Sequence, residues 1–346
     1  MSDPAAAPPL PHWKNGLDLT PAGLGWRGEP RENPWDRLPL DLKTQIPENL
    51  WNLGTQSAGV YLQFRSAATQ LRVRWKLQEA WPYAPNTTGC GISGFDLYGR
   101  DAQGHWRWAG SVFTGNPAEG EGTLNRMPLD GQPREYRLYL PLRRRVLGLE
   151  MGSDAEIVPL PRDPRPPLAY YATSIVHGEG VGRPGMTQAA LVARHFDVEL
   201  LNLGFCGSAR CEPAIAAALA RLDPRLYLID VLPNNSAAEA AERIPPLLDT
   251  LRTARPHTPI LLLGDRIYGD ATFCPVRDAV FSEKNQTLAR IFADAQRRGM
   301  QHLHLHLDPD WYGEDREGTT DASHPNDLGA WRMAQKLIPL LAPLLA

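Results

Sequence analysis

The sequence predicts two structural units, an all-β sandwich over residues 38–160 and a doubly wound parallel α/β domain over residues 168–346. The first half contains short runs in which apolar and polar residues alternate, a pattern typical of half-buried antiparallel strands. The second half alternates nearly continuous apolar runs with helical ones, which indicates a parallel sheet covered on both faces. The proline-rich stretch PRDPRPP, residues 161–167, predicts a stiff junction between the two units. Residues 1–37 are expected to form an extended N-terminal segment.

The sandwich is predicted from alternating runs rich in β-branched and aromatic residues. These runs are GVYLQFR (59–65), LRVRW (71–75), GFDLY (94–98), WRWAGSV (106–112) and YRLYLPL (136–142). The segments NTTG, DAQG, TGNP and DGQ lie between them and have the composition of turns. No long helical face interrupts the pattern, so packing two antiparallel sheets together is the expected way to bury the apolar residues.

The α/β domain is predicted from five apolar runs with helical runs between them. The expected strands are AYYATSI (169–175), ELLNLG (199–204), LYLIDVL (226–232), PILLLGD (259–265) and HLHLHL (302–307). The expected helices cover residues 187–196, 212–222, 237–254, 285–298 and 327–345. In such open sheets, the groups that bind ligands collect beyond the carboxyl ends of the strands.

Charge and composition exclude several classes of function. The 346 residues carry a net charge of −3, so no basic excess favours nucleic acid or an anionic membrane as the main partner. The four cysteines have no paired C-x-x-C spacing, which argues against a zinc site and a disulfide framework. We expect no metal and no cofactor.

Neither a secretory signal nor a membrane span is visible. The start, MSDPAAAPPLPHWKNG, lacks a basic stretch followed by a long apolar one. No run approaches the roughly 18 apolar residues that a transmembrane helix needs. A soluble, cytoplasmic protein is expected, and its oligomeric state is left open.

Four segments at predicted strand ends carry the groups of an acyl-transfer site. They are TSI after the first strand, NLGFCGS after the second, DVLPNN after the third and DASHPND before the last helix. Together they supply a hydroxyl, backbone donors, a side-chain amide and an Asp/His pair. A nucleophile, oxyanion donors, a general base and a group that orients the base are what acyl transfer requires.

In this order, the four segments resemble those of the SGNH/GDSL hydrolase family. YYATSI is similar to the first family block and gives Ser174. NLGFCG is similar to the second block and gives Gly207, and LPNN is similar to the third and gives Asn234. DASHPNDLG is similar to the last block and gives Asp321 and His324. The resemblance implies a flavodoxin-like sheet, and the SGFDLY run resembles an N-terminal β domain carried by a subset of these enzymes.

The resemblance also implies the roles of these residues. Ser174 is the expected nucleophile, His324 its base and Asp321 the carboxylate that orients the base. The backbone N–H groups of Ser174 and Gly207 and the amide of Asn234 are the expected oxyanion donors. Read without the other blocks, Ser174 is a polar residue that ends a strand, Asn234 is a turn residue and Gly207 permits a positive φ angle. Asp321 could serve a turn instead of His324.

The implied activity is that of a serine esterase. Relatives with this arrangement act on small acyl esters, often acetyl groups on carbohydrates, so a small-molecule or carbohydrate ester is the expected substrate. Acyl transfer to an alcohol acceptor would use the same residues. A noncatalytic glycan-binding protein on a hydrolase scaffold is the alternative from another class.

Other motifs have competing interpretations. His302, His304 and His306 fall on one face of a strand, where they form either a metal tract or, in the commoner case, a polar outer face. His177 lines the pocket or sits in an exposed loop. Residues 180–185 spell G-x-G-x-x-G, but five residues separate them from the strand end, which disfavours a dinucleotide site and favours a loop beside the active site.

Aromatic residues of the first half also leave two interpretations open. They could stack on sugar rings, or they could form the core and one wall of the catalytic cleft, which is the commoner role of aromatics in a sandwich. The residues concerned are Trp81, Tyr83, Trp106 and Trp108.

Overall fold

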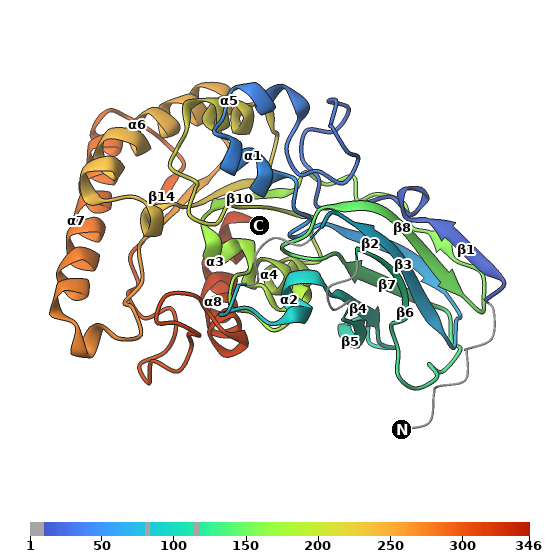
Figure 1. The fold of residues 1–346 in the computed structure, drawn as a ribbon. Helices are drawn as coiled ribbons and strands as arrows, with labels where there is room; N and C mark the ends of the chain where they lie inside the picture. The colour runs from blue at the N-terminus through green and yellow to red at the C-terminus, as the bar shows by residue number, and fades with distance from the viewer. Residues whose placement is uncertain (1–9, 80–83, 114–117) are drawn as a thin grey trace.

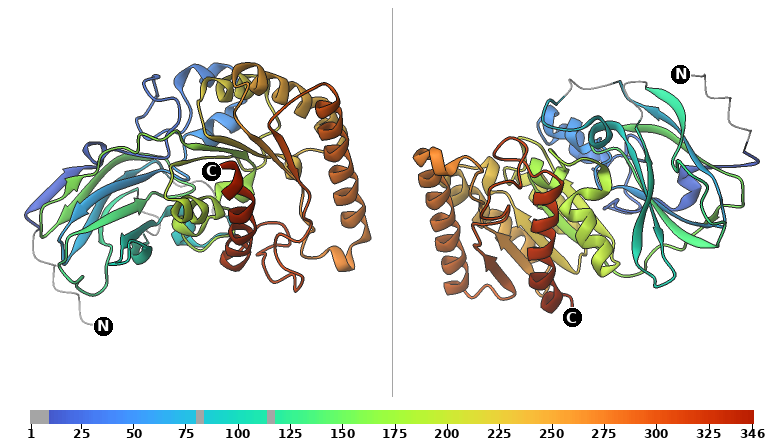
Figure 2. Two further views of the ribbon diagram at one scale, coloured as in Figure 1. Left: turned by 180° about the vertical axis from the view of Figure 1, so that it is seen from behind. Right: turned by 90° about the horizontal axis from the view of Figure 1, so that it is seen from below.

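A β-sandwich and an α/β domain lie beside each other in the computed structural model, which describes residues 10–79, 84–113 and 118–346 (Figure 1). The sandwich is built mostly from the blue and green part of the chain, and the α/β domain from the yellow to red part. Two further views show the same arrangement (Figure 2). The predicted fold class is confirmed.

The sandwich consists of two antiparallel sheets. One has the order β1-β8-β3-β6, with bounds His12–Asn15, Val146–Ser153, Leu71–Leu77 and Glu119–Thr123. The other has the order β5-β4-β7-β2-β9, with bounds Trp106–Val112, Phe95–Arg100, Arg134–Tyr139, Tyr61–Ser66 and Val158–Pro159. Alternate residues of both sheets, such as Leu62, Phe64, Val73 and Met151, are fully buried in the layer between them. This is the burial that the alternating sequence pattern predicts.

The α/β domain has one parallel sheet with the order β11-β10-β12-β13-β14. In chain order the strands are Leu168–Ala172, Leu200–Gly204, Leu226–Asp230, Ile260–Leu263 and Leu303–His306, which are β10 to β14. Numbered within the domain, the order is 2-1-3-4-5, which is the flavodoxin-like order. The switch point lies at β10, the first strand.

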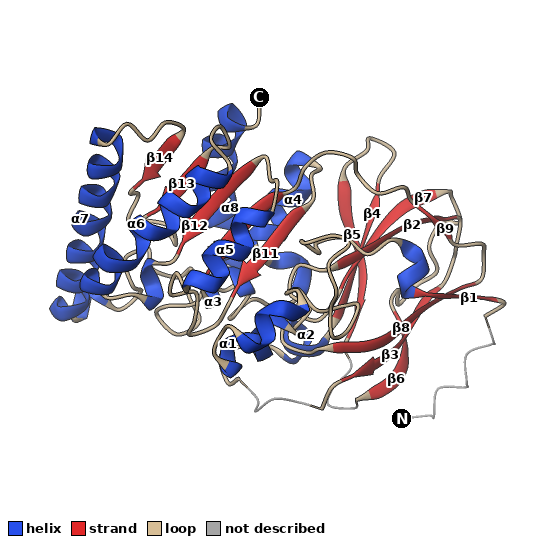
Figure 3. Ribbon diagram, turned by 90° about the horizontal axis from the view of Figure 1, so that it is seen from above, coloured by secondary structure: helices blue, strands red, loops and turns tan. Residues whose placement is uncertain are grey.

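Helices cover both faces of this sheet (Figure 3). On one face, strand residues such as Tyr171 and Ile229 share a core with α5 (Pro213–Arg221), α6 (Ala237–Ala254) and α7 (Pro275–Arg297). On the other face, Tyr170 and Leu228 share a core with α3 (Ser174–His177), α4 (Gln188–Phe196) and α8 (Asp327–Leu341). Neighbours along a strand therefore point into different cores, and every strand has to be apolar throughout.

The N-terminal residues contribute to both units. β1 pairs with β8 in the sandwich, and it is followed by the short helix η1, Gly16–Leu19. Farther on, η2 (Leu40–Thr44) and α1 (Glu48–Gly54) bury Leu42, Leu50 and Trp51 in the core of the α/β domain. The described part of residues 1–37 is thus not simply extended, and part of 38–160 packs on the α/β domain.

Arg37 attaches the N-terminal segment to the edge of the parallel sheet. Its buried guanidinium donates to the carbonyls of Asn202 and Gly204 at 2.7 and 3.0 Å. Both carbonyls lie on β11, the edge strand of the parallel sheet. Edge strands leave such groups without a partner strand, and the arginine satisfies two of them.

The domain boundaries at 37, 160 and 168 stay a prediction.

The GFDLY run forms a contact between the two units. Asp96 on β4 is fully buried and accepts hydrogen bonds from Gly185 N and Arg183 Nη1 in the α/β domain, both at 2.8 Å. Tyr98, two residues along the same strand, lies under the Arg194 guanidinium at 3.9 Å. A buried carboxylate requires such partners, so this motif fixes the sandwich against the loop that leads into α4.

Candidate active site

Ser174 lies at the switch point of the parallel sheet. β10 ends at Ala172, and Ser174 is the first residue of the short helix α3. This is the position beyond a strand's carboxyl end where doubly wound folds bind their ligands. Only 7% of Ser174 is exposed.

His324 and Asp321 come from the loop between β14 and α8. The loop is held by a bridge between Thr319 and Pro325 and by a bond from Thr320 N to the His324 carbonyl at 2.8 Å. The Ser174 Oγ is 2.8 Å from His324 Nε2, and His324 Nδ1 is 2.7 Å from Asp321 Oδ2. The structure therefore brings these three predicted residues into one continuous chain of hydrogen bonds.

The Asp321 carboxylate is held in the charged form. Burial alone would raise its pKa, but donation from the backbone and the ring of His324 and from Asn86 outweighs burial and lowers the pKa well below its usual range. Its Oδ1 accepts from Ser323 N and His324 N at 3.1 and 2.8 Å. With Oδ2 facing the ring, Asp321 favours the tautomer that carries its proton on Nδ1 and leaves Nε2 free to accept the serine proton.

Gly207 and Asn234 lie next to each other on adjoining loops. Asn234 ends the short helix η4, Leu232–Asn234, and its Nδ2 donates to the carbonyl of Ser208 at 2.5 Å. Gly207 has a φ of +65°, a conformation that glycine adopts without steric cost, and no atom lies within 4 Å of where a side chain would begin. The loop is tied to the Ser174 strand by a bond from Phe205 N to the Ala172 carbonyl at 2.9 Å.

Three further polar residues reach this site that the sequence did not reveal. Asn86 Nδ2 is 2.8 Å from Asp321 Oδ2 and 3.1 Å from Glu179 Oε1. Arg143 Nη1 donates to Glu179 Oε2 at 3.0 Å. Asn86 and Arg143 belong to loops of the sandwich half, where NTTG has the composition of an ordinary turn. No local pattern marks either residue as part of a site.

His177 does not sit in an exposed loop. It is fully buried, and its Nε2 is 2.9 Å from the Leu142 carbonyl. Burial, together with the charges of Arg37 and Arg143, lowers the pKa of His177 well below its usual range. A neutral ring that donates to a backbone carbonyl makes this residue part of the packing between the two units.

The glycine-rich loop over 180–185 packs against the His324 loop. A side chain at Gly180, whose φ is +92°, would begin 2.6 Å from the Pro325 carbonyl and 3.3 Å from the His324 Cβ. Gly182 N donates to Asp327 Oδ1 at 2.7 Å. The glycines therefore allow two loops to approach closely beside the site, and the Gly182 amide is already engaged by a carboxylate.

The three histidines near β14 do not converge. His302 precedes the strand and lies against His257, at 5.8 Å between ring centroids, while His306 lies against Trp311 at 5.4 Å. Among the described residues, no group of three or more His, Cys, Asp or Glu side chains could hold a metal ion. No helix in the described part of the chain combines the length and apolar character needed to cross a membrane.

Of the four aromatic residues considered for sugar stacking, Trp81 and Tyr83 lie outside the described residues. Trp106 is half-buried, with guanidinium groups of Arg100 and Arg137 at 4.3 and 4.5 Å from its ring. Its Nε1 donates to Asp197 at 3.2 Å. Trp106 therefore tethers the sandwich to the α/β domain.

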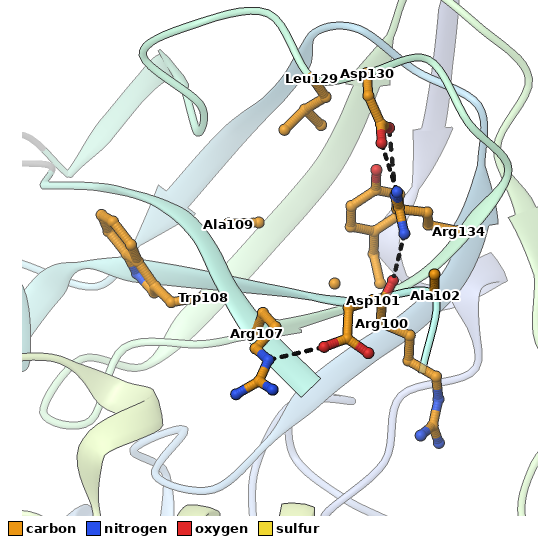
Figure 4. A pocket seen from close by; sticks show the side chains of 11 residues that line it. Arg100, Asp101, Ala102, Arg107, Trp108, Ala109, Leu129, Asp130 and Arg134 are labelled. Carbon is orange, nitrogen blue, oxygen red and sulfur yellow. Dashed lines mark hydrogen bonds and ion pairs between the residues drawn. The ribbon is translucent and has the colours of Figure 1, made fainter. Parts of the chain in front are cut away.

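Trp108 is different, since 54% of it is exposed. It borders a hollow of about 410 Å³ on the sandwich, which also contains the ion pairs Arg107–Asp101 and Arg134–Asp130 (Figure 4). None of the predicted site residues lines this hollow. Four of its charged side chains form these two pairs, and the fifth, Arg100, pairs with Glu135 and Asp197 outside the hollow.

Two family models together match most of the chain. The model of the GDSL-like lipase/acylhydrolase family matches residues 165–342, and a model of the N-terminus of SGNH-hydrolase-type esterases matches residues 12–158. No match was found among curated proteins.

Solved structures resemble the chain over nearly its whole length. A protein from Bacteroides ovatus described as a GDSL-like lipase is 27% identical, covers 96% of this chain and 98% of its own, and gives a TM-score of 0.90. A salicylyl-acyltransferase from a tetracycline biosynthetic pathway is 19% identical, with coverages of 96% and 97% and a TM-score of 0.77. A family two carbohydrate esterase from Clostridium thermocellum is 13% identical, with coverages of 83% and 93% and a TM-score of 0.59. The last two likenesses concern the fold, whereas the family model covers half of the chain, and the chain therefore belongs to the GDSL-like lipase/acylhydrolase family.

Proposed function

We propose that this hydrolase is a serine esterase that cleaves small acyl esters through an acyl-enzyme on Ser174, with O-acetylated carbohydrates as its substrate class. The observation that carries the proposal is the chain of hydrogen bonds from Ser174 Oγ through His324 to Asp321, at 2.8 and 2.7 Å. A serine hydroxyl is a weak nucleophile unless a neighbouring base takes its proton, and here His324 Nε2 is within reach of that proton.

The proposed reaction has two halves. Ser174 Oγ attacks the ester carbonyl while its proton passes to Nε2, and the N–H groups of Ser174 and Gly207 and the Asn234 amide donate to the oxyanion. The tetrahedral intermediate collapses, the C–O bond to the alcohol breaks, and the alcohol leaves with the proton from Nε2. Water then attacks the acyl-enzyme in the same way, which releases the acid and restores Ser174.

A compact acyl group suits the position of Ser174. Because only 7% of this residue is exposed, a short acyl chain reaches its Oγ with less displacement of the surrounding loops than a long one. The likeness of the fold to carbohydrate esterases supports a sugar as the alcohol part of the ester.

The test is a series of p-nitrophenyl esters of increasing chain length, followed by acetylated sugars with acetate release as the readout. We expect acetyl esters to be cleaved fastest and Ser174→Ala to lose the activity while its circular dichroism spectrum stays that of the wild type. Wild-type protein that hydrolyses none of these esters, or a Ser174→Ala variant that retains turnover, would refute the proposal.

Acyl transfer is the second candidate, favoured by the likeness of the fold to a salicylyl-acyltransferase over 96% of this chain. It differs only in that an alcohol replaces water in the second half-reaction. Mass spectrometry of the products formed with an added alcohol acceptor separates the two. Mostly free acid indicates an esterase, and mostly transferred ester indicates an acyltransferase.

A further inference from the structure

A loop of the sandwich half inserts one side chain between two carboxylates of the α/β domain. Asn86 lies in the loop between β3 and α2, Gly89–Ser93, and its Nδ2 donates to Asp321 Oδ2 at 2.8 Å and to Glu179 Oε1 at 3.1 Å. An amide nitrogen carries two protons, one for each carboxylate. Since both neighbours are acceptors, the nitrogen and not the oxygen of the amide has to face them.

The next two residues attach the same loop to the α/β domain. Thr87 Oγ1 accepts from Gly180 N at 3.2 Å, and Thr88 Oγ1 donates to the Gly182 carbonyl at 2.6 Å. Thr88 Oγ1 also accepts from Gly91 N at 2.9 Å, as the N-cap of α2. Asn86 is thus presented by a loop with several anchors rather than by a free turn.

The two carboxylates lie near opposite nitrogens of the His324 ring. Asp321 Oδ2 is 2.7 Å from Nδ1, and Glu179 Oε2 is 4.0 Å from Nε2. Nε2 is also the atom that Ser174 Oγ approaches at 2.8 Å. A carboxylate that moved closer to Nε2 would therefore compete with the serine for the same position.

Glu179 carries a negative charge and is restrained at both oxygens. Burial would raise its pKa, but the charges of His324 and Arg143 and the hydrogen bonds to Cys206 and Asn86 lower it below its usual value. Arg143 Nη1 binds Oε2 at 3.0 Å, while Asn86 binds Oε1. Removing Asn86 leaves Arg143 as the remaining strong restraint.

We propose that Asn86 is a positioning residue that holds Glu179 away from His324 Nε2. Its amide bridges Glu179 and Asp321 and so fixes the distance of Glu179 from the ring. The inference rests on the proposed function, because it concerns the base of that mechanism. It also gives the sandwich a part in catalysis that acts through other residues.

The charge distribution around His324 predicts the direction of the effect. The charged groups that face the ring are Asp321 and Glu179, with Arg143 behind Glu179, while Asn86 is neutral. Without Asn86, Glu179 gains freedom to approach Nε2. A carboxylate closer to Nε2 stabilises the charged imidazolium, so His324 should keep its proton to a higher pH.

The experiment measures the titration of His324 by NMR of the imidazole ring, with the signal assigned through His324→Gln, together with the pH profile of kcat/KM. In Asn86→Ala, we expect the titration midpoint and the acid limb of the profile to rise together by about one pH unit. Below the wild-type midpoint, kcat/KM should fall about tenfold, and well above both midpoints it should stay unchanged. Glu179→Gln should lower the midpoint relative to wild type, and Asn86→Ala combined with Glu179→Gln should match Glu179→Gln alone.

Thr88→Val is the matched control. It removes the bond to the Gly182 carbonyl on the same loop but touches neither carboxylate, so it should lower the thermal stability without moving the midpoint. A midpoint that stays in place in Asn86→Ala would overturn the inference. A midpoint that moves equally in Thr88→Val would also overturn it, because the effect would then belong to loop docking in general.

The two readouts distinguish this inference from the proposed function. Wild-type protein without esterase activity would refute the function, whereas the NMR titration still decides whether Asn86 positions Glu179. If Asn86→Ala does not fold, Glu179→Gln decides, since an unchanged midpoint in that variant would show that Glu179 does not act on His324.

Discussion

Replacing Asp321 with asparagine should harm activity more than replacing it with alanine, although asparagine has nearly the same shape. The Asp321 carboxylate accepts four hydrogen bonds, from Ser323 N and His324 N at Oδ1 and from Asn86 Nδ2 and His324 Nδ1 at Oδ2. An asparagine offers one oxygen and one NH2 group in this place. Whichever way the amide is turned, its NH2 group faces donors.

The less costly orientation keeps the oxygen toward the two backbone N–H groups and turns NH2 toward His324. The ring then has to accept at Nδ1 and carry its proton on Nε2, where it is unable to take the proton of Ser174. The conflict between donors costs about 1–3 kcal/mol, which corresponds to about a 5- to 150-fold difference in rate. Alanine avoids this conflict, because Asp321 is one-third exposed and water can accept from Nδ1.

The assay compares kcat/KM for p-nitrophenyl acetate in wild type, Asp321→Asn and Asp321→Ala. Both variants should be slower than wild type, since both lose the charge that stabilises the imidazolium, and Asp321→Asn should be the slower by the factor above. Equal rates in the two variants, or a faster Asp321→Asn, would contradict the tautomer argument. Rates of both variants near that of wild type would remove Asp321 from the mechanism.

Four further predictions concern the oxyanion donor, the pH dependence of activity, the pH dependence of stability and a buried ion pair. Asn234→Ala should lower kcat by about 10²–10³-fold with little change in KM, as steady-state kinetics will show. Because the pKa values of Asp321 and Glu179 are lowered, both stay charged well into the acid range, and the acid limb of kcat/KM should fit one proton. The pKa of Asp321 in the folded state lies below its unfolded value of about 3.9. The charged carboxylate therefore stabilises the fold above pH ~3.9, and this stabilisation is lost as the pH falls below it. Thermal unfolding measured as a function of pH tests this. Arg266 and Asp230 form a buried ion pair at 2.6 Å. Arg266→Met leaves the buried carboxylate without its partner and should lower the free energy of unfolding, measured by urea titration, by about 3–5 kcal/mol. An unchanged free energy of unfolding would show that the pair is hydrated.

The parts of the fold that follow from the sequence are those with a strong local pattern. The strands of the parallel sheet are buried on both faces, so each is an apolar run. The strand β6 is not among the predicted runs because its sequence, EGEGT, has no apolar alternation. β8 is also not among them, although its sequence, VLGLEMGS, does alternate. The glycines of β6 are explained by packing, since a side chain at Gly120 would begin 2.6 Å from the Trp75 ring on the neighbouring strand.

The start of a helix is also hard to predict where its first turns lack a clear apolar face. α7 begins at Pro275, ten residues before the start expected from the sequence. Its first turns expose Val276 and Val280 and bury little, so the periodic apolar face that marks a helix in sequence is weak there.

Some residues of the candidate site can be proposed from local sequence motifs, and others cannot. Ser174, Gly207, Asn234, Asp321 and His324 lie in short motifs, at strand ends or just before the last helix, and could be proposed from the sequence. Asn86 and Glu179 could not, because their roles depend on contacts between distant segments. Asn86 and Asp321, for example, are 235 residues apart in the chain.

Covalent labelling of the nucleophile tests the central claim most directly. Wild-type protein is incubated with a fluorophosphonate, and the modified peptide is identified by mass spectrometry. The account predicts one adduct, on Ser174, with labelling that is abolished in Ser174→Ala and strongly slowed in His324→Ala. No adduct on Ser174, or labelling at an unchanged rate without His324, would contradict it.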